Sequence, residues 1–245
     1  MDSAIELHSV VKRYGQTMAV NGLSLSVKPG ELFAFVGPNG AGKTTTIKMI
    51  VGLLHPDEGQ VQICGQSIGE NGLTVKSFIA YVPDQPFLYD KLTGNEFLRF
   101  VARMYGVSAH RRDQIIEELS DRFAMNGFLD QMTEGYSHGM KQKVVIASAL
   151  LHDPWVLVID EPMVGLDPRT VREVKDLFSE RARQGGTLFM STHTLEVAEA
   201  IADRIGIISH GQLVAVGTMA ELRAQADQQH SLEEIFLQLT EEIGE

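Results

Sequence analysis

Residues 37–44 read Gly37-Pro38-Asn39-Gly40-Ala41-Gly42-Lys43-Thr44 and fit the phosphate-loop pattern, in which a glycine-rich loop binds phosphate through backbone N–H groups. A continuous apolar run at residues 31–36 precedes the loop and predicts a buried strand. Apolar residues at helical spacing follow it as far as Leu54. The predicted order of strand, loop and helix points the amino-terminal end of a helix at bound phosphate. An ordinary strand–helix turn is the alternative, and it requires the fixed positions to match by chance.

The residues at the end of this loop carry side chains that suit a nucleotide. Lys43 would reach the β- and γ-phosphates, the Thr44 hydroxyl would bind Mg²⁺, and Thr45 would contact the α-phosphate. These residues predict a site for a nucleotide and Mg²⁺.

A second polar group, Asp160-Glu161, ends the apolar run of residues 156–159. Ligand sites of parallel sheets lie at the carboxyl ends of the strands, so both carboxylates are expected beside the phosphates. Asp160 is predicted to contact Mg²⁺ and Glu161 to act as the general base that polarises the attacking water. When such an acidic pair stands alone, it is more often a turn or a helix cap.

The composition of the chain excludes several classes of protein. Its 245 residues are 44% hydrophobic and 22% charged, which is typical of a globular chain and not of a disordered or fibrous one. No apolar stretch is long enough to span a bilayer, and the first residues lack a leader pattern, so we expect neither a secreted nor a membrane-spanning chain. The single cysteine suits a reducing compartment. A net charge of −11 disfavours broad contact with nucleic acid.

Strand and helix signals alternate along most of the chain, which predicts an α/β fold. Strands are expected at residues 4–11, 22–27, 31–36, 79–82, 156–159, 187–190, 205–208 and 213–216. About sixty-five residues after the strand at 79–82 show helical periodicity with almost no strand signal. We therefore divide the chain into a discontinuous core (1–85 and 151–220), an inserted helical subdomain (86–150) and a helical tail (221–245), in which Ser231 opens a capping box.

Several short motifs occur in an order and spacing that resemble the ATP-binding subunit of an ABC transporter. They are Tyr14, the loop 37–44, Gln85, the string 136–143, Asp160-Glu161-Pro162, Gly165-Leu166-Asp167-Pro168 and His193. The resemblance covers essentially the whole chain. It implies a P-loop NTPase core with a mixed sheet, an N-terminal antiparallel part and an inserted helical subdomain. Two such chains would close head-to-tail around two ATP molecules.

The resemblance also implies roles for residues within one subunit. Tyr14 would stack its ring on adenine, although an isolated Tyr-Gly after a strand is otherwise a surface turn. Gln85 would contact Mg²⁺ and the attacking water at the junction with the helical subdomain, where it could act as a switch. His193 would bond the γ-phosphate and sense its loss.

Three further residues would act across the pair of subunits. Ser137 would cap a helix beginning near Gly139, so that its hydroxyl, the Gly139 N–H and the helix dipole meet the γ-phosphate of the second chain. Asp167 would couple the two sites, and with Pro168 it also suits the start of a helix.

The signature string departs from the usual Leu-Ser-Gly-Gly-Gln of this family at three positions, Tyr136, His138 and Met140. A thioether cannot replace the amide hydrogen bonds of glutamine, so contacts to the nucleotide in the second subunit should be weaker or differently arranged. These departures, and the end of the chain, resemble the ATPases associated with ABC-2 type exporters.

The implied function is an ATP-hydrolysing motor of an exporter, held at the cytoplasmic face of the membrane by permease subunits and paired with a second ATP-binding subunit, identical or not. No nucleic acid partner is expected. An ABC-type ATPase acting on nucleic acid or ribosomes is the main alternative, and a monomeric phosphate-loop kinase is another. Aromatic residues after Gln85 would either line the groove for a permease helix or fill the core of the helical subdomain; they are Phe87, Tyr89, Phe97 and Phe100.

Overall fold

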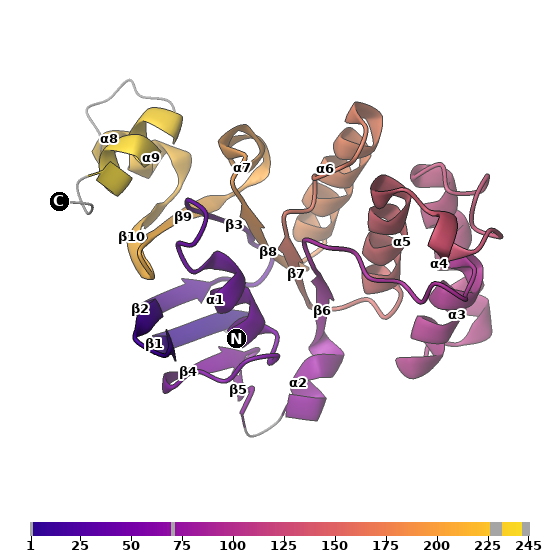
Figure 1. The fold of residues 1–245 in the computed structure, drawn as a ribbon, viewed down its shortest axis with the longest axis horizontal. Helices are drawn as coiled ribbons and strands as arrows, with labels where there is room; N and C mark the ends of the chain where they lie inside the picture. The colour runs from indigo at the N-terminus through magenta and orange to yellow at the C-terminus, as the bar shows by residue number, and fades with distance from the viewer. Residues whose placement is uncertain (1, 70–71, 226–231, 242–245) are drawn as a thin grey trace.

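The computed structural model describes residues 2–69, 72–225 and 232–241, which form two sheets with helices around them (Figure 1). The first sheet is antiparallel and has the strand order β2-β1-β4-β5. Its strands are β1 (Ile5–Tyr14), β2 (Thr17–Val27), β4 (Glu58–Ile63) and β5 (Gln66–Ser67). This is the expected antiparallel part at the N-terminus.

The second sheet has the strand order β10-β9-β3-β8-β7-β6. Its first five strands along the chain are parallel, and β10 pairs with β9 in the antiparallel direction, which makes the sheet mixed. The strands are β3 (Leu32–Val36), β6 (Ile79–Val82), β7 (Val156–Asp160), β8 (Thr187–Thr192), β9 (Arg204–Ser209) and β10 (Gln212–Gly217). The carboxyl ends of β3, β7 and β8 therefore lie side by side at one edge.

Helices fill the intervals between the strands. They are α1 (Lys43–Ile50), α2 (Gly72–Phe78), α3 (Gly94–Met104), α4 (Ala109–Arg122), the 3₁₀ turn η1 (Thr133–Gly135), α5 (His138–Leu150), α6 (Pro168–Arg183), α7 (Leu195–Ile201), α8 (Met219–Gln225) and α9 (Leu232–Glu241). Residues 83–155, all described, hold α3, α4, η1 and α5 and no strand, and α3 to α5 stand together at one end of the molecule (Figure 1). The division into a core and a helical subdomain stays a prediction.

Successive side chains of the central strand β3 point to opposite faces of the sheet and so belong to different hydrophobic clusters. Phe33 and Phe35 face the cluster shared with α1 and the antiparallel sheet, and Ala34 and Val36 face the cluster under α7. Leu32 joins the cluster formed with α3, α4, α5 and α6. Every β3 residue is buried, as expected for a strand of a parallel sheet covered on both faces.

Polar residues begin three of the helices that position the site. Thr93 and Glu96 form a capping box at α3, Ser137 caps α5, and Asp167 caps α6 ahead of Pro168. The predicted helix starts at Asp167 and Ser137 are both confirmed, and α5 begins at His138, next to the expected Gly139.

Some elements differ from the sequence-based expectation. Strands β4 and β5 and helix α2 were not predicted. Residues 55–59, where β4 begins, indicated only the end of the helix that follows the phosphate loop. The tail helix α8 begins two residues before the expected boundary at 221, and the capping box at Ser231 lies outside the described residues. None of the described helices combines the length and apolar character needed to cross a membrane.

Candidate functional site

The phosphate loop joins the carboxyl end of β3 to α1, as expected. Gly42 caps α1 in the left-handed region with φ of 108°, and a Cβ there would lie 2.4 Å from the Ala19 carbonyl oxygen, so only glycine fits. The ammonium of Lys43 lies within the loop, where it donates to the carbonyls of Gly37 (2.7 Å) and Pro38 (3.1 Å). Burial lowers the pKa of Lys43, and the carboxylates of Glu161 and Asp160 oppose that shift.

Asp160 ends β7 and is almost fully buried, with 1% of its surface exposed. Its Oδ2 accepts a hydrogen bond from the Thr44 hydroxyl at 3.0 Å, and its Oδ1 accepts one from the Ser191 hydroxyl on neighbouring β8. The strand register places Ser191 opposite Asp160. A threonine hydroxyl and a carboxylate are thus brought together from opposite halves of the chain, and both are oxygen donors of the kind that Mg²⁺ prefers.

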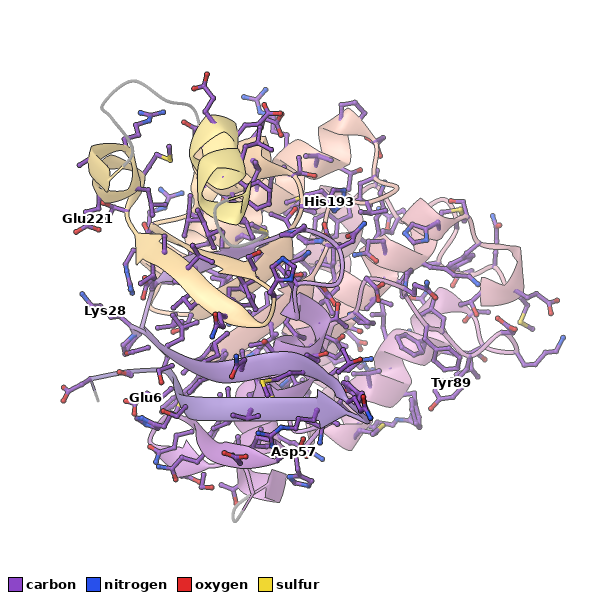
Figure 2. All side chains as sticks on the ribbon, turned by 60° about the vertical axis from the view of Figure 1, so that its left-hand side comes forward. Glu6, Lys28, Asp57, Tyr89, His193 and Glu221 are labelled. Carbon is purple, nitrogen blue, oxygen red and sulfur yellow. The ribbon has the colours of Figure 1, made fainter. Side chains whose placement is uncertain are left out.

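Glu161 follows β7 in the left-handed region, with φ of 50°. Its Oε1 accepts the backbone N–H of His193 at 2.9 Å and lies 2.7 Å from His193 Nδ1, and its Oε2 accepts the Thr192 hydroxyl at 3.3 Å. Its backbone N–H donates to the Ser191 carbonyl at 3.1 Å. His193, which follows β8, therefore holds the carboxylate of Glu161, which follows β7. The His193 side chain, labelled in Figure 2, is 58% exposed and free to reach a ligand.

A cavity of about 340 Å³ lies between these groups. Its walls are Ala19, Asn39, Gly40, Gly42, Lys43, Thr44, Thr45, Asp84, Asp160, Glu161 and His193. Nine of these eleven residues are predicted site residues, and the other two, Ala19 and Asp84, were missed. Asp84 follows β6 at the same edge of the sheet as Asp160, so the rule that selected Asp160 could have found it.

Several predicted residues lie outside the cavity wall. Gln85 is exposed, and its backbone N–H donates to Asp84 Oδ1 at 2.8 Å. Tyr14 is 52% exposed at the end of β1. Of the phosphate loop, Gly37, Pro38 and Ala41 do not line the cavity.

The residues expected to act on a second subunit form a separate group. Gly139 lies against the loop that leads to α6, because a Cβ on Gly139 would be 2.6 Å from the Gly165 carbonyl oxygen. In the same loop, Asp167 accepts the N–H of Thr170 at 3.0 Å and its hydroxyl at 2.6 Å. These bonds lower the pKa of Asp167 to about 2. Ser137 and Asp167 are exposed, and neither they nor Gly139 line the cavity.

Comparison with known proteins identifies this arrangement. A family model described as ABC transporter matches residues 20–164, more than half of the chain. The chain belongs to the ABC transporter family. The probable multidrug ABC transporter ATP-binding protein YbhF of Escherichia coli K12 is 35% identical over 242 residues, covering 97% of this chain and 42% of YbhF. The chain thus spans less than half the length of that relative.

Solved structures agree with this membership of the ABC transporter family. A structure of an ATP-binding subunit of an ABC transporter superposes with a TM-score of 0.92 at 34% identity, covering 97% of this chain and 99% of the other. The dimeric structure of MJ0796, a bacterial ABC transporter cassette, gives 0.81 at 26% identity, covering 88% and 98%. The predicted family and fold class are confirmed. The matches give no support to action on nucleic acid or ribosomes.

The three departures from the usual ABC transporter signature have structural explanations. Tyr136 is buried, and its hydroxyl donates to the Phe128 carbonyl at 2.8 Å and accepts the Gly94 N–H at 3.2 Å. The His138 ring covers Gly165, where a Cβ would lie 2.4 Å from the ring. Met140 is half-buried against the cluster shared with α3, α4 and α6, so its thioether faces this subunit's own core. Tyr136 therefore ties α5 to the start of α3.

Proposed function

We propose that this subunit binds Mg-ATP in the 340 Å³ cavity and hydrolyses it to ADP and phosphate. The observation that carries the proposal is that Lys43, the Thr44–Asp160 pair and the Glu161–His193 pair all line that one cavity. Asn39, Gly40 and Gly42 would bind the phosphates with the loop backbone, and Thr45 would contact the α-phosphate. Lys43 would turn from its own loop carbonyls to the β- and γ-phosphates.

Thr44 and Asp160 would hold Mg²⁺, Asp160 through water, since their oxygens already lie 3.0 Å apart. When bound, the ion would neutralise charge on the phosphate oxygens. Gln85 would join them only after a displacement, because Asp84 now occupies the cavity wall beside it. Such a displacement would move the helical segment that begins next to Gln85, which suits a switch between nucleotide and permease.

Glu161 would act as general base. A water oxygen attacks the γ-phosphorus, the bond from that phosphorus to the ADP oxygen breaks, and the water proton passes to the Glu161 carboxylate. His193 would orient that carboxylate through its backbone N–H and ring nitrogen and would bond the γ-phosphate with its exposed edge. Tyr14 would stack on adenine at the end of β1.

A second ATP-binding subunit would complete the site. The exposed Ser137, Gly139 in the first turn of α5 and the loop at Asp167 do not line this chain's own cavity, and they would serve a nucleotide bound by the second subunit. The MJ0796 cassette, which this chain resembles, is a dimer. We propose head-to-tail pairing with an identical or related chain.

The remaining partners would be permease subunits that hold the pair at the cytoplasmic face of the membrane, in a transporter that exports its substrate. YbhF, a relative, is a probable multidrug transporter subunit. Three aromatic side chains near Gln85, Phe87, Tyr89 and Phe100, are exposed and offer a surface for a permease helix, as Tyr89 illustrates at the surface of the helical segment (Figure 2). The fourth, Phe97, is buried and belongs to the core.

The test combines turnover with partner capture. Glu161→Gln should retain ATP binding and lose at least 99% of hydrolysis, in line with the roughly 10²–10⁴-fold contribution of a general base. Lys43→Ala should lose ATP binding. Normal turnover by Glu161→Gln would exclude Glu161 as the base. Affinity capture with the tagged Glu161→Gln chain and Mg-ATP should then recover a protein with several membrane spans, and recovery of ribosomal proteins alone would contradict the transporter assignment.

A further inference from the structure

The turn between β9 and β10 lies against the phosphate loop. It consists of His210 and Gly211, because Ser209 pairs with Gln212 across the hairpin. The φ angles are 48° and 78°, and two positive values in a two-residue turn are the mark of type I′. Gly211 is buried although it sits at the tip of a hairpin. A buried hairpin tip has a neighbour that it contacts.

Two backbone hydrogen bonds identify the neighbours on either side of Gly211. Its N–H donates to the Ala41 carbonyl, within the phosphate loop, at 2.9 Å. Its own carbonyl accepts the Asn21 N–H of β2 at 2.8 Å. One residue of the hairpin therefore connects the antiparallel sheet with the loop that binds the phosphates.

The contacts leave no room for a side chain. A Cβ on Gly211 would lie 2.9 Å from the Ala19 carbonyl oxygen and 3.1 Å from the Val20 Cα. The two ends of the phosphate loop are even closer to backbone: a Cβ on Gly37 would lie 2.4 Å from the Ile208 carbonyl oxygen, and one on Gly42 would lie 2.4 Å from the Ala19 carbonyl oxygen. The loop is therefore seated on the backbones of β2 and β9.

The hydrogen bond from Gly211 to the Ala41 carbonyl fixes the direction of a backbone N–H on the other side of the phosphate loop. A trans peptide is planar, so its C=O and N–H point in opposite directions. The carbonyl of Ala41 and the N–H of Gly42 belong to the same peptide. When Gly211 holds that carbonyl, it sets the direction in which the Gly42 N–H points, and Gly42 lines the nucleotide cavity.

We propose that Gly211 is a positioning residue for nucleotide binding, acting through Ala41 on the Gly42 N–H. The proposal rests on the proposed function, since it assumes that the cavity binds a nucleotide. The Gly42 N–H serves the phosphates of ATP before and during hydrolysis alike. Loss of such a contact weakens ground state and transition state equally, which raises KM and leaves kcat unchanged.

The test is the Gly211→Ala variant, assayed for ATPase kinetics and for equilibrium binding of fluorescent N-methylanthraniloyl-ADP. Loss of one hydrogen bond to a phosphate should raise KM and the ADP Kd about tenfold, with kcat changed less than about twofold. The matched control is Gly185→Ala, because Gly185 also has a positive φ, of 94°, but open space around it. It should lose the same stability from backbone strain and keep wild-type KM and Kd.

Wild-type Kd in Gly211→Ala would overturn the proposal. Gly211→Asn serves as a second variant, since asparagine tolerates the left-handed region and still adds the obstructing Cβ. The unaltered chain gives an independent measurement: saturating ADP should slow amide exchange at Gly211 at least about fivefold and leave Gly185 unchanged. Equal exchange at Gly211 with and without ADP would refute the proposal. If the wild-type chain bound no nucleotide, the proposed function itself would fail.

Discussion

Replacing Ser191 by alanine tests the best-buried hydrogen bond of the site. The Ser191 hydroxyl donates to Asp160, and these residues are 0% and 1% exposed. Without this hydroxyl a charged acceptor loses one of its hydrogen-bond partners, which costs about 1.5–3 kcal/mol. We expect the free energy of unfolding to fall by about 2 kcal/mol, and for a chain of this size that corresponds to a melting temperature lower by roughly 4–8 °C.

Ser148→Ala provides the matched control. Ser148 is also buried, but its hydroxyl donates at 2.8 Å to the Val145 carbonyl within α5, a neutral acceptor already on a helix. Alanine is the better helix former by about 0.5 kcal/mol, which offsets part of the loss, so the net cost should be about 0.5 kcal/mol. Urea unfolding of both variants, compared at equal m-value, measures the difference. A Ser191→Ala loss no larger than that of Ser148→Ala would refute the argument that the Asp160 charge makes this bond strong.

Further results are expected at three residues. Asp167→Ala should lower the unfolding free energy by about 1 kcal/mol through loss of the α6 cap, whereas Asp167→Asn keeps the cap; equal losses in thermal melts would contradict this. Because its pKa is lowered to about 2 from 3.8, the charged Asp167 stabilises the fold above pH 3.8 and loses that effect as the pH falls toward 2, so the wild-type and Asn variants should converge in acid. Tyr136→Phe should cost about 1–3 kcal/mol in urea unfolding, since the Gly94 N–H and Phe128 carbonyl lose their partner; an unchanged midpoint would contradict it. Burial lowers the pKa of His152 below 6.5, so stability should fall as the pH drops through 6.5, and His152→Gln should lessen that fall; identical pH profiles would show that another group is responsible.

The sequence predicted what depends on local pattern. The phosphate loop, the carboxylates after β7 and the caps at Ser137 and Asp167 each follow from residues within a few positions of one another. Strand β4 was missed because it pairs with β1 across about fifty residues, and its own signal is only Val61 and Ile63 alternating with glutamines.

The parts of the site that were missed depend on tertiary contact. Ser191 contacts Asp160 only because β7 and β8 are neighbours in the sheet. The order of strands in a sheet cannot be predicted from the sequence of either strand alone. In the sequence, Tyr136 is only a departure from the usual signature of the family. In the structure, its hydroxyl joins two segments that lie far apart along the chain. The exposed position of Gln85 beside Asp84 likewise depends on where the chain turns after β6.

Because the backbone at Glu161 is left-handed, the residue that gives the most folded protein at this position should differ from the residue that gives the fastest ATP turnover. A non-glycine residue with φ of 50° costs about 1 kcal/mol or more, and glycine or asparagine would remove most of that cost. In a library of all residues at this position, sorting cells for the amount of folded protein should enrich glycine and asparagine, while sorting for ATP turnover should return glutamate. The conflict between the two selections would show that position 161 keeps a strained backbone for the sake of turnover.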